Sequence, residues 1–521
     1  MKTNLYPQKL SNLLIDFPNL GGISNINFWR KPFFALFLFF ISVATVFPQS
    51  WTQLGANIEG QESYSLLGYS VSMSADGYTI IAGGTGLDQN EEDSGYAKVL
   101  IWNGTSWIQK GSDLYGEAFE DQFGYSVSIS SDGNTIAVGA IQDDDDQLRL
   151  GYAKIYTWNG TSWILKGNKI SGENAYDRFG TSISLSSDGN TVAVSSRQGA
   201  SREEEGSVRV FTWNGSVWTQ IGSDLDGVEW DYFGGSISLA SDGNTLAVGA
   251  AGGNAIHGYA RLYNWSGTEW VQKGNDLVGD AEWDRFGFSV SISDDGNTVA
   301  IGAKENDGNG EASGQLKVFN WNGSSWVQKG NDIYGQAAYD YFGWSVGLNS
   351  NGNTVAVGVT PFSTNRGWSN GNVRVYTWNN SSWEQVGEEM SGDTEGDRAG
   401  YVTAINSDGS IVAMAAPFVG YVKIYSYMYT GISGISDTKK ITIHPNPFIS
   451  LATIEYELQQ REEVSLSIYN HLGQRIYQTQ ETQQQGKQKF IWNAEGYADG
   501  IYYYRLQVGE QVANGKMVKV R

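Results

Sequence analysis

Few side chains in this chain could carry nucleophilic or metal-dependent catalysis. The sequence has no cysteine and three histidines: His444 and His471 near the C-terminal end, and His257 alone further upstream. A serine or cysteine nucleophile needs a histidine beside it, and a multi-histidine metal site needs several imidazoles. We therefore expect that the protein is not an enzyme. Hydrolysis of polysaccharide by paired carboxylates stays open as an alternative.

A second group of residues combines aromatic rings with carboxylates. They recur just before a Phe-Gly dipeptide, or before Leu67-Gly68 in the first repeat, in segments that we call entry loops. They are Tyr64, Phe119, Asp121, Tyr176, Asp177, Trp230, Asp231, Trp283, Asp284, Tyr339 and Asp340. Rings beside carboxylates suit sugar faces or cationic groups, so these residues are candidates for ligand binding. The alternative is structural: the aspartates would bond backbone amides where the chain enters a strand, and the rings would wedge between repeats.

Further acidic residues gather in loops that differ from repeat to repeat, which we call variable loops. The densest run is Asp143, Asp144, Asp145 and Asp146. Calcium prefers hard oxygen ligands of this kind. A solvated acidic loop is nevertheless the favoured interpretation, and no other metal or cofactor is expected.

These loops belong to a repeat with a regular period. An Asp-Gly or Asn-Gly turn recurs at spacings of 53 to 57 residues, at Asp76, Asp132, Asp188, Asp242, Asp295, Asn351 and Asp408. On either side of the turn, apolar residues alternate with polar or small ones, as in residues 126–129 and 135–138. This alternation predicts two half-buried strands joined by a tight hairpin. With two further strands in each repeat, this period is typical of a β-propeller blade.

The first and last repeats are incomplete in complementary ways. A strand that begins with tryptophan occurs at Trp51, before the first full repeat, and is missing from the last repeat, Tyr401 to Tyr427. If the strand at Trp51 completes that last repeat, two exposed sheet edges disappear. We therefore predict an all-β chain in which residues 51–429 form a seven-bladed propeller whose last blade is shared between its two ends.

The repeat also carries a family resemblance. Phe-Gly opening one strand and Gly-Ala closing the next, as at Phe123, Gly124, Gly139 and Ala140, resembles the FG-GAP repeats of integrin α-subunit propellers and their bacterial relatives. Integrin-type repeats often hold calcium in a D-x-D-x-D-G loop. Here the turn reads only S-x-D-G-N, so the resemblance does not imply calcium sites.

Charge narrows the choice of partner. The chain carries a net charge of -22; because its first 50 residues carry +3 and residues 439–521 carry +2, about -27 falls on the residues between them. An acidic surface repels nucleic acid and anionic membranes. Neither is an expected partner of the propeller.

The N-terminal residues predict export. Arg30 and Lys31 precede an apolar run over residues 33–47, which is short for a membrane span and suited to the core of a signal peptide. We predict a signal peptide with a long n-region over residues 1–50. No other segment is apolar enough to cross a membrane.

The C-terminal residues follow a different pattern. Residues 430–440 form a polar linker, and the short strands of 441–521 predict a small immunoglobulin-like β-sandwich. Its motifs occur at Pro445, Asn446, Pro447, Gly473, Gly500, Tyr502 and Lys516. They resemble the type A C-terminal sorting domain of the type IX secretion system of Bacteroidota. The resemblance implies that a translocon reads the domain and that a sortase removes it.

Together these features predict an exported protein in the extracellular space or on the outer-membrane surface. We expect the propeller to bind or adhere to an extracellular glycan or protein through its loop face. Two alternatives remain: a structural surface or matrix component without a small ligand, and a carboxylate-based polysaccharide hydrolase.

Overall fold

The computed structural model describes residues 50–61, 65–86, 93–142, 149–197, 205–252, 257–361, 369–427, 441–458, 460–470, 475–508 and 511–520. The predicted signal peptide up to residue 49, Tyr64, the Asp143 to Asp146 run, the predicted linker and Gly473 lie outside these ranges. Within them the chain is all-β, and no helix is long and apolar enough to span a membrane.

Residues 51–427 form seven antiparallel sheets of five strands each, the blades of a β-propeller. The first strands of neighbouring blades lie side by side around the axis. They are β3 (Ser70–Met73), β8 (Ser126–Ile129), β13 (Ile183–Leu185), β18 (Phe233–Leu239), β23 (Phe286–Ile292), β28 (Phe342–Leu348) and β33 (Val402–Ile405). We number the blades one to seven in this order.

The second and third strands follow outward from the axis. The second strands are β4 (Thr79–Gly84), β9 (Thr135–Ala140), β14 (Thr191–Ser196), β19 (Thr245–Ala250), β24 (Thr298–Ala303), β29 (Thr354–Val359) and β34 (Ile411–Ala416). The third strands are β5 (Tyr96–Trp102), β10 (Tyr152–Trp158), β15 (Ser207–Trp213), β20 (Tyr259–Trp265), β25 (Gln315–Trp321), β30 (Asn372–Trp378) and β35 (Tyr421–Tyr427).

The outer strand of each blade is split into two short strands that both pair with the third strand. The tryptophan-containing halves are β1 (Trp51–Gln53), β6 (Trp107–Gln109), β11 (Trp163–Leu165), β16 (Trp218–Gln220), β21 (Trp270–Gln272), β26 (Trp326–Gln328) and β31 (Trp383–Gln385). The other halves are β2 (Ile58–Glu59), β7 (Leu114–Tyr115), β12 (Ile170–Ser171), β17 (Leu225–Asp226), β22 (Leu277–Val278), β27 (Ile333–Tyr334) and β32 (Met390–Ser391).

A glycine explains the split. Between β11 and β12, Gly167 has a φ of 80°, and a Cβ atom placed there would lie 2.7 Å from the Trp213 ring of the next blade. Only glycine combines this backbone conformation with so close a neighbour. The outer strand therefore bends away for a few residues to make room for the adjoining blade.

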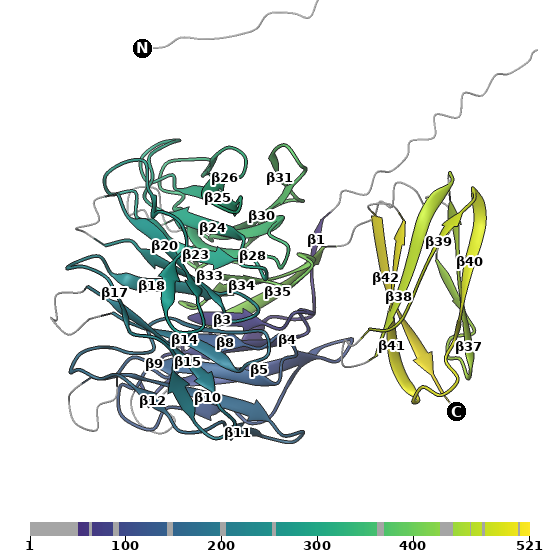
Figure 1. The fold of residues 1–521 in the computed structure, drawn as a ribbon, viewed down its shortest axis with the longest axis horizontal. Helices are drawn as coiled ribbons and strands as arrows, with labels where there is room; N and C mark the ends of the chain where they lie inside the picture. Colours follow the sequence, from purple (N-terminus) through teal and green to yellow (C-terminus); the bar gives the residue numbers. More distant parts are fainter. Residues whose placement is uncertain are drawn as a thin grey trace, which may run out of the picture. The chain divides into compact units, whose positions relative to one another are not determined.

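The shared last blade is confirmed. β1 pairs with the C-terminal half of β35, where Trp51 lies opposite Tyr427, and β2 pairs with its N-terminal half, where Ile58 lies opposite Val422. Figure 1 shows β1, in purple, beside β35, in green. The N-terminal strands thus complete the sheet formed by the last repeat and cover the outer edge of β35.

Two rings of hydrogen bonds join the blades. Next to the axis, the hairpin between the first and second strands of each blade donates one backbone N–H to a carbonyl of the next blade, at 2.9 to 3.2 Å. The series is closed and runs through Ala75, Ser131, Ser187, Ser241, Asp294, Ser350 and Ser407 back to Ala75. Near the rim, an indole N–H of each blade donates to a carbonyl of the preceding blade at 2.7 to 3.1 Å, from Trp51, Trp107, Trp163, Trp218, Trp270, Trp326 and Trp383.

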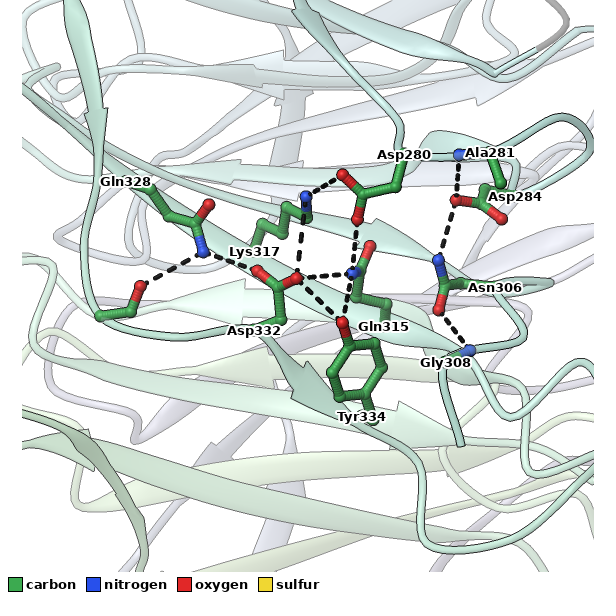
Figure 2. A network of polar contacts seen from close by, with 11 residues as sticks. Asp280, Ala281, Asp284, Asn306, Gly308, Gln315, Lys317, Gln328, Asp332 and Tyr334 are labelled. Atoms are coloured by element: carbon green, nitrogen blue, oxygen red, sulfur yellow. Dashed lines mark hydrogen bonds and ion pairs between the residues drawn. The ribbon is translucent and has the colours of Figure 1, made fainter. Parts of the chain in front are cut away.

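Ion pairs add a third type of link. The third residue of every third strand is a cation with a carboxylate partner: Lys98, Lys154, Arg209, Arg261, Lys317, Arg374 and Lys423. Figure 2 shows Lys317 between Asp280, from the preceding blade's entry loop, and Asp332 of its own blade, with N–O distances of 2.5 and 3.8 Å. Lys154, Arg209, Lys317, Arg374 and Lys423 thus bind a carboxylate of the preceding entry loop, whereas Lys98 and Arg261 pair with an aspartate of their own blade. Because an unpaired buried charge is costly, the first five cations help to hold the entry loops in place.

The C-terminal residues form a small β-sandwich. One sheet contains β36 (Thr442–His444), β37 (Leu451–Leu458) and β40 (Gly486–Asn493), and the other contains β38 (Glu462–Tyr469), β39 (Arg475–Gln483), β41 (Gly500–Val508) and β42 (Gln511–Lys519). Alternating residues of both sheets fill one core, with Trp492, Ile454 and Leu466 fully buried.

The closure of the ring can be tested by removing residues 51–60, which supply β1 and β2. We expect aggregation or a large fall in melting temperature, because the last blade would lose its outer strand and the Trp51 indole bond to Val386. Thermal denaturation and size-exclusion chromatography measure this. The variant Thr52→Ala, which changes an exposed side chain of β1, is the control. Unchanged melting of the deletion variant would contradict the shared blade.

Candidate binding face of the propeller

The described residues of the entry loops and variable loops lie on one face of the propeller, which we call the loop face. In an antiparallel blade the connection between the second and third strands emerges on the same side as the connection to the next blade. Isolated bridges confirm this: Gly95, at the end of one variable loop, pairs with Phe123, and Gly151 pairs with Phe179. The Asp-Gly hairpins lie on the opposite face.

The entry-loop aspartates point inward and accept hydrogen bonds. Asp121 is fully buried, and its Oδ2 atom accepts the N–H groups of Glu117 and Ala118 at 2.7 and 3.0 Å and the Tyr152 hydroxyl at 2.7 Å. Asp177 and Asp340 accept two backbone N–H groups each, and Asp231 accepts the Tyr259 hydroxyl. These carboxylates therefore fix the shape of their loops.

The fifth blade adds a variable loop to this arrangement. Figure 2 shows the Asp284 carboxylate between the Ala281 N–H, at 3.0 Å, and the Asn306 amide, at 2.8 Å. Asn306 in turn accepts the Gly308 N–H at 2.8 Å. One buried carboxylate thus connects the entry loop to the adjoining variable loop.

Burial affects the protonation of these groups. Burial raises the pKa of Asp177 above its ordinary value, against the lowering effect of the Asn174 and Glu173 amides. At Asp397, burial also acts to raise the pKa, but hydrogen bonds from Thr394 and Tyr421 leave it below the ordinary value. In each case the carboxylate interacts with groups of its own loop and strand.

The aromatic residues of the entry loops point outward. The exposed fractions of Phe119, Tyr176, Trp230 and Trp283 are 40, 39, 46 and 56%. Tyr339 is half-buried, and its hydroxyl bonds Glu311 of a variable loop. In the pairs that contain Phe119, Tyr176, Trp230 and Trp283, the ring therefore faces solvent and the carboxylate faces the loop.

Four of these rings sit on strained backbone. Tyr176, Trp230, Trp283 and Tyr339 have φ values of 66 to 71°. This left-handed conformation costs a bulky residue on the order of 1 kcal/mol or more, and it persists only where the surroundings impose it. The aspartate that follows each ring supplies that constraint, because it accepts amides at the start of the loop. Asp177, Asp231 and Asp284 are buried, and Asp340 is half-buried.

Metal ligands are sparse in the part of the chain that the structure describes. There, no group of three or more His, Cys, Asp or Glu side chains could hold a metal ion. In the first hairpins, Asp132 accepts the Ser130 hydroxyl at 2.6 Å and the Asn134 N–H at 2.9 Å, so this carboxylate shapes the turn.

The motifs of the C-terminal sandwich come together at one edge. Asn446, between Pro445 and Pro447, accepts the Val518 N–H at 2.8 Å, and Phe448 exchanges two backbone hydrogen bonds with the same strand. In β41, Gly500 lies opposite Lys519, and Tyr503 lies opposite Lys516. Tyr502 is buried, with its ring centroid 5.1 Å from that of Trp492.

Comparison with known proteins agrees with both parts. Residues 442–520 match the family described as secretion system C-terminal sorting domain, and residues 116–156 and 279–319 match the FG-GAP repeat. The chain carries FG-GAP repeats and a type IX sorting domain. The sorting domain indicates export to the cell surface or the extracellular space. No curated protein matches the chain.

Solved structures that are similar to this chain include two propellers. The C-terminal WD40 domain of Sif2 is 11% identical, with a TM-score of 0.46, and the match covers 73% of this chain and 99% of that domain. Sqt1 from Chaetomium thermophilum is 16% identical, with a TM-score of 0.43, and the match covers 70% of this chain and 82% of Sqt1.

Sequence reasoning passed over one position, the residue that follows each Phe-Gly pair or, in blades one and seven, the equivalent Leu67-Gly68 and Ala399-Gly400 pairs. Its side chains meet around the axis on the loop face: ring centroids lie 5.3 Å apart for Phe288 and Trp344, 5.5 Å for Trp344 and Tyr401, 5.7 Å for Tyr401 and Tyr69, and 4.9 Å for Tyr69 and Tyr125. We call this arc of five blades the collar. Alignment of the repeats shows the aromatic residues, but only the closed ring brings them into contact.

Export can be tested through the terminal strand. Deleting residues 516–521 removes the end of β42 and the backbone partners of Phe448, so we expect the protein to remain in the periplasm. Cell fractionation and surface labelling measure this. Lys489→Ala, which changes an exposed residue of the other sheet, should be exported normally. Normal surface levels of the truncated chain would disprove the role of the strand.

Proposed function

We propose that this protein is a secreted or cell-surface binding protein whose propeller adheres to an extracellular glycan or protein through the loop face. The observation that carries the proposal is the repeated entry loop, in which a buried aspartate holds an exposed aromatic ring on strained backbone. Strain of this kind gathers at functional sites, and rigid exposed rings are frequent anchors at interfaces.

The electrostatics of the loops support a role in binding rather than catalysis. A carboxylate that acts as a general acid or nucleophile has to reach its substrate. Asp121 and Asp177 instead accept hydrogen bonds from amides of their own loops and are 0 and 4% exposed. We propose that the entry-loop aspartates position the rings and that the rings contact the ligand.

The sorting domain supplies the remaining partners in this proposal. The translocon would bind the C-terminal sandwich, and a sortase would separate it from the propeller. The propeller would then act alone, either released or attached to the surface.

The proposal is tested by replacing Trp230 and Trp283 with Ala. Because these rings are 46 and 56% exposed, we expect little change in melting temperature, within about 0.5 kcal/mol of stability for each, and loss of binding on arrays of glycans and matrix proteins. Trp270, which is 9% exposed, is the matched control: Trp270→Ala should cost about 3–5 kcal/mol of stability. A marked fall in melting temperature for both loop variants would instead make their rings structural wedges.

A further inference from the structure

The collar is interrupted at two neighbouring blades. The position that is aromatic in the other five blades holds Thr181 in blade three and Gly235 in blade four. The first strands there keep the spacing of the rest of the ring, since the Ser182 hydroxyl accepts the Ile237 N–H at 3.3 Å and the Ser236 hydroxyl accepts the Val290 N–H at 3.0 Å. The interruption is therefore a change of side chain and not of backbone.

The interruption leaves open space. Gly235 is exposed, and a Cβ atom placed on it would meet the Tyr232 carbonyl at 3.2 Å and no other described atom within 4 Å. Gly249, one strand further out, would meet backbone at 2.0 Å. Among the described residues, Gly235 therefore lacks the side-chain volume that the aromatic residues supply in the other blades, and only the Tyr232 carbonyl lies close to its Cβ position.

The charge around the collar differs from that of the propeller as a whole. Two repeated positions border the collar: the residue before each Phe-Gly pair and the residue after each second strand. In the seven blades these positions include no Asp or Glu, and they include the cations Arg178, Arg197, Arg285, Lys304 and Arg398. Blades three and five, on either side of Gly235, hold two cations each.

Several of these cations lie beside aromatic rings and beside the opening. Lys304 lies 4.2 Å from the Phe288 ring centroid and 4.4 Å from that of Trp344, and Arg197 lies 5.4 Å from that of Tyr232. Arg285 donates to the Ala251 carbonyl of blade four at 2.9 Å. Glu305 lies 3.3 Å from Lys304 and 3.7 Å from Arg285, so these three side chains together carry one net positive charge.

We propose that the opening at Thr181 and Gly235 binds the end of a saccharide that carries a single carboxylate, such as a terminal uronic acid. Flat aromatic surfaces suit the face of a sugar ring, and guanidinium and ammonium groups suit its carboxylate. A polyanion is disfavoured, because about -27 of charge falls on residues 51–438. This inference rests on the proposed binding function and names the ligand class.

An extended peptide fits the opening less well. Peptides that add to a sheet edge need a row of unpaired backbone amides. Around the axis, serine hydroxyls of one blade accept amides of the next at every second residue, as from Leu185 to Ser128, Leu239 to Ser184 and Ile292 to Ser238. The inner strand edges are therefore already occupied.

The test uses the protein as it is exported and a matched pair of probes: an oligosaccharide that ends in glucuronic acid, and the same oligosaccharide after reduction of its carboxyl group to give terminal glucose. Isothermal titration should show binding of the acidic probe at least about tenfold tighter than that of the neutral probe, because hydrogen bonds to charged groups are strong. Equal or absent binding of the acidic probe would overturn the inference.

Variants locate the site. Gly235→Tyr completes the collar with a residue found at three equivalent positions and should weaken binding of the acidic probe at least about tenfold, whereas Gly235→Ala should retain it. If Gly235→Tyr fails to fold, Thr181→Tyr serves the same purpose. Independently of these two variants, Lys304→Met should reduce the preference for the acidic probe. Unchanged affinity in these variants would overturn the site. If Trp230→Ala still abolishes binding to the arrays, the proposed function stands without this inference.

Discussion

The structure depends on a closed circle of seven backbone hydrogen bonds around the axis. Each first hairpin donates to the next, and the circle is complete only because Ser407 of the last blade donates to Ala75 of the first at 3.0 Å. Every blade buries its core against its neighbours: Phe123 packs with Ile81 and Val99 of the preceding blade. Because each repeat contacts mainly its neighbours, we expect the stability of a blade to depend on these interfaces, and that of the first and last blades on the pairing of β1 with β35.

Closure also explains how the two faces differ. On the hairpin face, tight turns such as that at Asp132 are held by their own hydrogen bonds and by the inner circle. On the loop face, the chain passes between blades and carries the buried aspartates, the exposed rings and the collar. Because the scaffold is fixed elsewhere, the side chains of the loop face can vary without loss of the fold. Thr181 and Gly235 are such variations: they change the collar and leave the blade spacing intact.

The blade count could be predicted from the sequence because turn residues and the alternation of apolar and polar residues report on local structure. The shared blade could be predicted because the strand missing from the last repeat matches an extra strand before the first. The split of the outer strand was not predicted, since it depends on a ring of the next blade meeting Gly167. The entry-loop aspartates were recognised, and their structural alternative matches the observed bonds to backbone amides. The collar was missed because its rings, such as Tyr69 and Tyr401, touch only after the ring closes.

Native-state hydrogen exchange of the amides in the inner circle tests the central claim most directly. If the circle is one cooperative unit, the amides of Ala75, Ser131, Ser187, Ser241, Asp294, Ser350 and Ser407 should exchange only through global unfolding, with the same free energy and the same dependence on denaturant. Fast exchange confined to Ser407 and Ala75, with the other five still protected, would show that the shared blade opens independently and would contradict the account.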